Sequence, residues 1–126
     1  MKSDAEVMAL CDIIRVTGFA IHQYLRHGHL EKVYENAMVN RLTKGGVLLQ
    51  QQYPLAVFDE DGTLLGDYYA DLLVEQVLVV ELKAVKALAN EHIAQILGYL
   101  RASHMRHGLL INFGAPKFEI RKYVMS

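Results

Sequence analysis

Asp71, Glu81 and Lys83 are charged side chains within one of the most apolar stretches of the sequence, YYADLLVEQVLVVELKA, which runs from Tyr68 to Ala84. Asp71 stands ten residues before Glu81, and Lys83 follows Glu81 by two. Taking an ion out of water costs roughly several kcal/mol, even after the surroundings relax. A core strand that carries these charges must therefore contain something that compensates them.

Two carboxylates and an ammonium group in one place suit two kinds of site. One is a structural ion cluster, which is the ordinary explanation of an isolated Glu-x-Lys tripeptide. The other is a divalent-metal site, because Mg²⁺ selects hard oxygen ligands, usually one or two carboxylates with waters and substrate phosphate oxygens. A neighbouring lysine could then hold or help deprotonate an attacking water and offset charge on a pentavalent phosphate. Both explanations stay open here, and the second is the chemistry of phosphodiester hydrolysis.

Strand geometry decides whether Asp71 joins the other two charges. Glu81 and Lys83 are two residues apart, so on a strand they project from the same face. A two-residue loop at 75–76 would send Asp71 to the opposite face, whereas a three-residue loop at 75–77 pairs Asp71 directly with Glu81. We expect the odd-length loop, or a bulge.

The elements that must position these residues are predicted from hydrophobic periodicity. Apolar residues recur at three- and four-residue intervals, the period of a helix face, in three segments: 4–25, 30–44 and 90–102. Strands are predicted at 47–58, 64–74, 77–84, 108–112 and 118–124. The segment DEDGT suits a hairpin turn, and Gly45-Gly46 suits the end of the second helix. The order ααβββαββ indicates an α/β (α+β) fold with a mixed β-sheet flanked by helices.

Size and composition indicate one compact domain over residues 1–126. The formal net charge of −1 argues against a protein whose whole surface attracts nucleic acid, but it leaves room for a local basic patch. Cys11 is the only cysteine and the N-terminus lacks the features of a secretory signal, so we expect a cytoplasmic protein. Asp12, Arg15 and His22 interrupt the most apolar helical segment, which argues against a membrane span.

The charged residues also resemble a known sequence pattern. Asp71, nine intervening residues and then Glu81-x-Lys83 resemble the D...(D/E)xK core of the PD-(D/E)XK nuclease superfamily. The segment GHLEKVYE, residues 28–35, resembles the Gly-x-x-Glu-x-x-Tyr motif that names the GxxExxY protein family, which is assigned to that superfamily. The resemblance continues through EHIAQILGYL and HGLLINFG and covers nearly the whole chain. It implies a restriction-endonuclease-like fold.

The resemblance also implies a role for each site residue. Asp71 and Glu81 would hold Mg²⁺ or Mn²⁺, Lys83 would be the catalytic lysine, and Glu31 would approach the site from a helix. The implied function is a metal-dependent nuclease that acts on DNA.

Four further residues are predicted to contact the substrate. Gln95 and Tyr99 match a QxxxY pattern of nuclease relatives and lie one turn apart on one helix face. His92, three residues before Gln95, could line the same groove. Arg101 belongs to a group of basic residues that would hold phosphates if it flanks the site and is otherwise a solvated face: Arg101, His104, Arg106, His107, Lys117, Arg121 and Lys122.

Two neighbours in the helical motif are assigned structural roles from their positions. Tyr34 is predicted to pack in the core with its hydroxyl group hydrogen-bonded nearby. Glu35 is predicted to be a solvated or capping residue, since acidic side chains near a helix start interact favourably with the helix dipole.

Two other functions remain alternatives to a nuclease. The first is a nucleic-acid-binding or regulatory protein on a nuclease scaffold, with the site retained but little turnover. The second is a protein-interaction module, dimeric through the long first helix, in which the charged cluster is structural.

Overall fold

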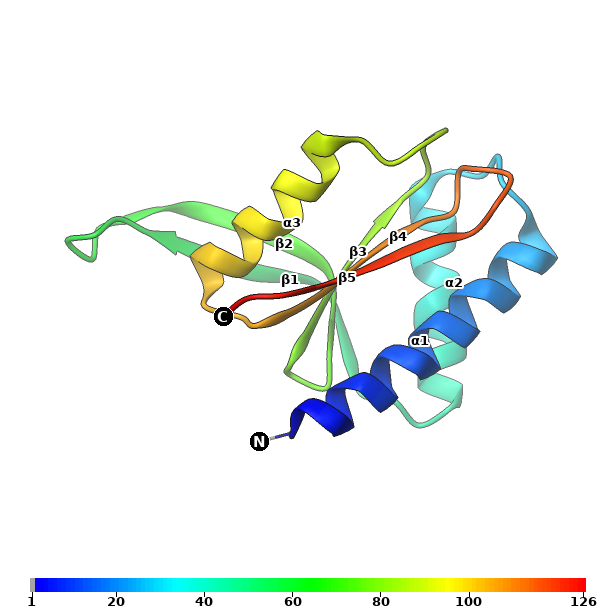
Figure 1. Cartoon of the computed structure of the whole chain (residues 1–126), viewed down its shortest axis with the longest axis horizontal. Helices are drawn as coiled ribbons and strands as arrows, with labels where there is room; N and C mark the ends of the chain where they lie inside the picture. The colour runs from blue at the N-terminus through cyan, green and yellow to red at the C-terminus, as the bar shows by residue number, and fades with distance from the viewer. Residues whose placement is uncertain (1) are drawn as a thin grey trace.

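The computed structural model describes residues 2–126 and contains three helices and one five-stranded sheet (Figure 1). The helices are α1 (Asp4–Leu25), α2 (Glu31–Lys44) and α3 (Asn90–Ser103). The strands are β1 (Leu49–Phe58), β2 (Leu64–Val74), β3 (Leu78–Lys83), β4 (His107–Asn112) and β5 (Glu119–Val124). The predicted order ααβββαββ and the α+β class are confirmed, and each element ends within two residues of its predicted bounds.

The sheet has the order β1-β2-β3-β4-β5 and is antiparallel except between β3 and β4. A parallel pair needs a crossover connection, and α3 supplies it. Because β3 and β4 are parallel, Lys83 and Asn112 lie side by side at one end of the sheet, while Leu78 and His107 lie at the other end.

Helices cover both faces of the sheet, with α1 and α2 on one face and α3 on the other (Figure 1). The first core joins α1 and α2 to side chains such as Leu72 and Ile111, and the second joins α3 to side chains such as Val79 and Leu110. The hairpin of β1 and β2 extends beyond these helices (Figure 1). Within residues 2–126, no helix is both long and apolar enough to cross a bilayer.

The ends of the first two helices follow local sequence signals. Ser3 caps α1 in a reciprocal pair of hydrogen bonds with Glu6, the capping box. At the end of α2, Gly45 is the C-cap and Gly46 has φ +83°, a conformation that glycine adopts without a steric penalty. The predicted stop at these two glycines is therefore confirmed.

The turn between β2 and β3 has the odd length that the charged residues require. Val74 pairs with Leu78, which leaves three residues in the loop. Glu75 and Gln76 have positive φ values of 51° and 65°, and the Val77 N–H donates to the Val74 carbonyl (3.1 Å). The predicted three-residue loop is confirmed, and its register sets Asp71 opposite Glu81.

Asn112 fixes the backbone that follows Lys83. It is fully buried, and its Oδ1 accepts hydrogen bonds from the amides of Val85 and Gly114, each at 3.0 Å. Its Nδ2 donates to the Val85 carbonyl (2.9 Å) and to Glu119 Oε1 (2.8 Å). One amide side chain therefore ties the ends of β3 and β4 together.

Substitution of Gly114 by alanine tests this close packing. A Cβ at this position would overlap the backbone of Ala84 and Val85, so we expect Gly114→Ala to lower the free energy of unfolding by roughly 1–3 kcal/mol. Gly98→Ala is the matched control, because no atom lies within 4 Å of its Cβ position in α3 and alanine favours a helix by about 1 kcal/mol. Urea denaturation should show the two variants shifting in opposite directions, and equal stability of Gly114→Ala and the parent would contradict the packing.

Candidate active site

Asp71 and Glu81 meet where the backbone pairing of β2 and β3 stops. The last paired residues are Leu72 and Val80. One step further along, the Asp71 N–H donates to Glu81 Oε1 (3.2 Å), and the Leu82 N–H donates to Asp71 Oδ2 (2.7 Å). The two carboxylates thus take the place of backbone partners, and the structure brings together the acids that the sequence singled out.

Burial makes this acidic pair electrostatically costly. Glu81 is only 4% exposed and Asp71 is half-buried. Burial, followed by the charge of Asp71, raises the pKa of Glu81 to about 9. Burial also raises the pKa of Asp71, against the opposing effect of hydrogen bonds from Leu82 and Gln52. Two acids this close in a low dielectric do not both ionise readily at neutral pH unless a cation compensates them.

Lys83 forms no ion pair with either carboxylate, and its charge only partly opposes the rise in the pKa of Glu81. Its Nζ donates to Gln95 Oε1 on α3 (2.8 Å), and within residues 2–126 no ion pair of 4.0 Å or less joins Lys83 to an acid. The ammonium group is held by a neutral amide, on the face of β3 that also carries Glu81. A structural ion cluster would use the lysine to offset the buried charge, so this geometry disfavours that explanation.

Glu35 belongs to the site, and the prediction that it is solvated or capping is wrong. It is 4% exposed and accepts hydrogen bonds from Lys32 Nζ (2.9 Å), Gln51 Nε2 (2.7 Å) and Gln52 Nε2 (2.9 Å). The physical reason is that α2 packs against β1, which presents two glutamine amides to this position. Helix periodicity alone could not show that partner strand.

Gln52 links Glu35 to the acidic pair and was not predicted as a site residue. Its Nε2 also donates to Asp71 Oδ1 (3.2 Å). Its φ of +49° interrupts the strand, in the gap between the pairs Gln51–Leu72 and Tyr53–Ala70 of the β1–β2 ladder. Such a conformation costs a residue other than glycine roughly 1–3 kcal/mol and is concentrated at functional sites. The one signal in the sequence was a run of three glutamines, 50–52, inside a predicted strand.

Glu31 lies in the first turn of α2, on the approach to the acidic pair. Its side chain is exposed at the surface. The pKa of Glu31 is nevertheless raised, first because the surrounding protein removes part of its hydration and second because of the charge of Asp71. The neighbouring Tyr34 is fully buried and stacks on Phe113 with ring centroids 4.7 Å apart. Its hydroxyl group donates to the Arg26 carbonyl, so the predicted core role of Tyr34 is confirmed.

Tyr99 lies close to the carboxylates of Asp71 and Glu81. His92 instead forms a hydrogen bond at the start of α3, the helix that carries both residues. Tyr99 packs against Tyr68, with ring centroids 4.6 Å apart and ring planes tilted by 38°. Burial, followed by the charges of Glu81 and Asp71, raises the pKa of Tyr99. His92 Nδ1 accepts a hydrogen bond from the amide of Ala89, the N-cap of α3 (2.9 Å).

The basic group is not gathered around the acidic pair. Arg101 is near the C-terminal end of α3 and lines a hollow with Arg106 and Met125. Arg106 precedes the start of β4, the end of the sheet opposite Lys83, and pairs with Asp4 at 3.5 Å. Arg101 therefore lies near the end of α3 that points away from the acidic pair.

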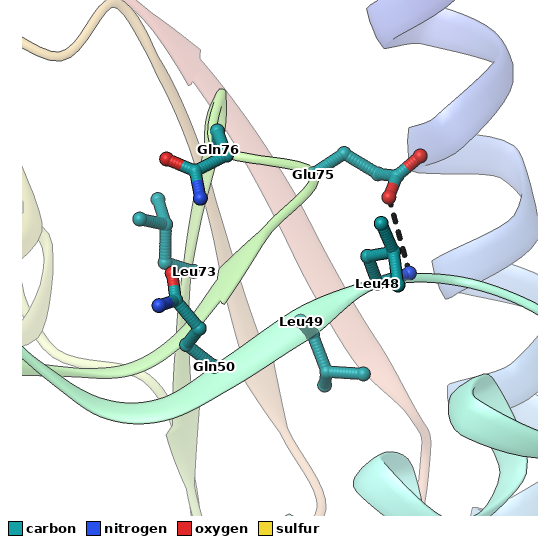
Figure 2. A pocket seen from close by; sticks show the side chains of 6 residues that line it. All are labelled: Leu48, Leu49, Gln50, Leu73, Glu75 and Gln76. Atoms are coloured by element: carbon teal, nitrogen blue, oxygen red, sulfur yellow. Dashed lines mark hydrogen bonds between the residues drawn. The ribbon is translucent and has the colours of Figure 1, made fainter.

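The hollow in Figure 2 also lies away from the acidic pair. Its lining residues are Leu48, Leu49, Gln50, Leu73, Glu75 and Gln76, at the turn end of β2 and β3. The one carboxylate in this lining, Glu75, already accepts a hydrogen bond from the Leu48 amide (3.1 Å; Figure 2). The chemistry of the side chains, rather than the shape of this hollow, therefore locates the candidate site.

The acidic pair fits a hard divalent ion as a partial ligand set. Mg²⁺ typically takes one or two protein carboxylates and completes its coordination with water and phosphate oxygens. Asp71 and Glu81 supply such oxygens, and burial raises the pKa of both acids. Within residues 2–126, no group of three or more His, Cys, Asp or Glu side chains is arranged as a metal-binding cluster, so protein carboxylates alone do not complete a site.

The pKa of Glu81 predicts a pH-dependent stability of the protein in EDTA. Because its pKa rises from 4.5 in the unfolded chain to about 9 in the folded protein, the folded state binds a proton that the unfolded state releases. The stability that this protonation provides is present below pH 4.5 and is lost as the pH rises to about 9. Glu81→Gln should flatten the fall in melting temperature over this range, and an unchanged pH profile would contradict the burial of an acid here.

Comparisons with known proteins agree with this geometry. Residues 8–123 match the family model of the PD-(D/E)XK nuclease superfamily. A crystal structure of SSO0001 has a similar fold, with a TM-score of 0.59 and 14% sequence identity, over 74% of this chain and 48% of that chain. The chain thus spans about half the length of that solved chain, and at this identity the likeness concerns the fold alone. No curated protein matches the sequence. Because the family model covers nearly the whole chain, including every residue of the candidate site, the protein belongs to the PD-(D/E)XK nuclease superfamily.

Proposed function

We propose that the protein is a metal-dependent nuclease that hydrolyses phosphodiester bonds of DNA. The observation that carries this proposal is the buried pair Asp71 and Glu81, beside a lysine, Lys83, that donates to Gln95 instead of forming an ion pair with them. Superfamily membership supports the reaction class. The segment 28–35 supports a finer assignment to the GxxExxY family, because Gly28, Glu31 and Tyr34 occupy the motif positions.

Asp71 and Glu81 would hold Mg²⁺ or Mn²⁺ in this proposal. When bound, such an ion would polarise the phosphodiester and make a water more acidic. Lys83, oriented by Gln95, would hold the attacking water and offset charge that develops on the phosphate. Glu31 would assist from α2, and Glu35 would orient Asp71 through Gln52.

The substrate side of the site would be formed by α3. Gln95 would release Lys83 and contact the substrate. Tyr99 would pack beside the substrate, next to Asp71 and Glu81. His92 would act at the start of this helix, and Arg101 would contact phosphates farther along it.

A nucleic-acid-binding protein with little turnover is the second candidate. The hydrogen bond from Lys83 Nζ to Gln95 favours it, because a lysine engaged by an amide is not free to act on a water. Both candidates require a divalent ion or phosphate, but only the nuclease requires Lys83.

Substitution of the lysine separates the two candidates. Purified protein would be incubated with single- and double-stranded DNA and RNA, with Mg²⁺, with Mn²⁺ or with EDTA. Cleavage should require the divalent ion and fall by at least about 100-fold in Lys83→Met, with binding largely kept, since the lysine acts mainly on the transition state. Lys86→Met, at an exposed position three residues away, is the control. Equal cleavage by Lys83→Met and the parent would contradict the proposed role, and binding without cleavage by the parent would favour the second candidate.

Thermal melts test the metal site without an activity assay. A ligand that binds only the folded state stabilises it by RT ln(1 + [L]/Kd), about 2.7 kcal/mol at 100 times Kd. Titration with Mg²⁺ or Mn²⁺ should therefore raise the melting temperature of the parent and of Glu91→Gln, a control at an exposed position. Glu81→Gln should lose most of this response, and no response in the parent would contradict metal binding at this pair.

A further inference from the structure

A polar hollow of about 350 Å³ lies between the end of α1 and the connection from β4 to β5. Two residues of its lining, Arg26 and Lys117, carry a positive charge, and no acidic residue of the described chain lines it. The lining residues are Phe19, His22, Gln23, Arg26, Pro116, Lys117 and Phe118. The hollow therefore presents positive charge without a carboxylate to neutralise it.

The fold does not use either of these two charges in an ion pair. Within residues 2–126, no ion pair of 4.0 Å or less involves Arg26 or Lys117, and both residues are exposed. The hollow beside Arg101 differs, because Arg106 in its lining pairs with Asp4 (3.5 Å). The end of α1 adds a partial negative charge of about half an elementary charge, which two full positive charges outweigh. The hollow between α1 and β5 is therefore suited to an anion.

The backbone of Arg26 has a conformation that is essentially confined to glycine. Its φ is 62° and its ψ is −177°, and backbone strain of this kind is concentrated at functional sites. The Arg26 N–H donates to the His22 carbonyl (2.9 Å), and the Tyr34 hydroxyl group donates to the Arg26 carbonyl. Glycine would adopt this backbone without the steric penalty, so the arginine at this position points to a use for its side chain.

The opposite wall of the hollow, which carries Lys117, is fixed by contacts with α1. His22 is buried, and its Nε2 forms a hydrogen bond with the Ala115 carbonyl (2.9 Å). The Phe118 ring packs against the rings of His22 and Phe19, with centroids 5.9 Å and 6.1 Å apart. The hollow is therefore preformed, and a ligand that binds there does not have to order its walls.

The hollow lies at the end of the sheet that carries Lys83. The Phe113 N–H donates to the Lys83 carbonyl (2.8 Å), and the Phe113 ring packs against Phe118 with centroids 5.6 Å apart. The connections that follow α1, β3 and β4 accordingly lie close together (Figure 1). A nucleic-acid strand carries a phosphate at every nucleotide, so a strand bound at the acidic pair offers further phosphates to this end of the molecule.

We propose that Arg26 and Lys117 form a phosphate-binding site for the nucleic-acid backbone, separate from the acidic pair. The planar guanidinium group can donate two hydrogen bonds to one phosphate, and the lysine adds a compact positive charge. The inference rests on the proposed function, because it takes the ligand to be the substrate of the acidic pair. Without a divalent ion the acids repel phosphate, whereas this site attracts it and should hold DNA in EDTA.

Fluorescence anisotropy of fluorescein-labelled single- and double-stranded DNA in EDTA tests this site without metal and without cleavage. Arg26→Gly and Lys117→Gln should each raise the dissociation constant by about tenfold. Each should also reduce the slope of log affinity against log salt concentration by about one, because one phosphate contact is lost. Lys44→Gln, an exposed position in the last turn of α2, is the control and should change neither quantity. A parent that does not bind DNA in EDTA, or dissociation constants of both variants equal to that of the parent, would overturn the proposal.

Thermal melts separate a role in binding from a role in the fold. Because glycine removes the steric strain, Arg26→Gly should melt at or above the temperature of the parent while it binds DNA more weakly. A variant that melts at a lower temperature and binds DNA as tightly as the parent would assign Arg26 to the fold and overturn the proposal.

Inorganic phosphate distinguishes a free anion from a nucleic-acid backbone. If phosphate raises the melting temperature of the parent while both variants bind DNA like the parent, the hollow takes a free phosphate and the proposed ligand is wrong. Failure of the nuclease proposal gives a different result. In that case the parent cleaves no DNA with Mg²⁺ or Mn²⁺, yet Arg26→Gly still lowers the affinity for DNA in EDTA.

Discussion

Two carboxylates that share a buried site repel each other, and the arrangement around Asp71 and Glu81 follows from that repulsion. The turn after β2 sets them side by side, and the β2–β3 pairing ends where they meet. Backbone amides of Asp71 and Leu82 then donate to the acids instead of to a neighbouring strand. The backbone of the strands thus provides hydrogen bonds to the pair, whereas Lys83 at the end of β3 donates to Gln95.

Neutral amides hold most of the remaining parts of the site in place, and Lys32 adds one ion pair, to Glu35. Gln52 connects Asp71 to Glu35, Gln95 holds Lys83, and Asn112 fixes the backbone that follows Lys83. An amide can orient a charged group without neutralising it. Because these partners are amides, the negative charge of the acidic pair stays available to a bound cation. The hydrogen bonds that Gln52 donates to Asp71 and Glu35 explain why its distorted backbone is tolerated.

The two faces of the sheet carry different features of the molecule. The α3 face carries Lys83, Gln95 and the tyrosine pair, whereas the α1 face carries the main core and, beyond it, an open apolar helix surface.

The sequence by itself determined the element order and the pairing of the two acids. Both depend on local properties: the helical period, the two-residue period of a strand, and a loop whose length sets the register. It also carried the superfamily pattern, which the match over residues 8–123 confirmed. Only the tertiary structure decided that Glu35 is buried, that Gln52 leaves the strand conformation, and that Arg101 lies apart from the acids. Each of these depends on which segments pack together from distant parts of the chain, and hydrophobic periodicity records which face of a segment is buried but not which partner buries it.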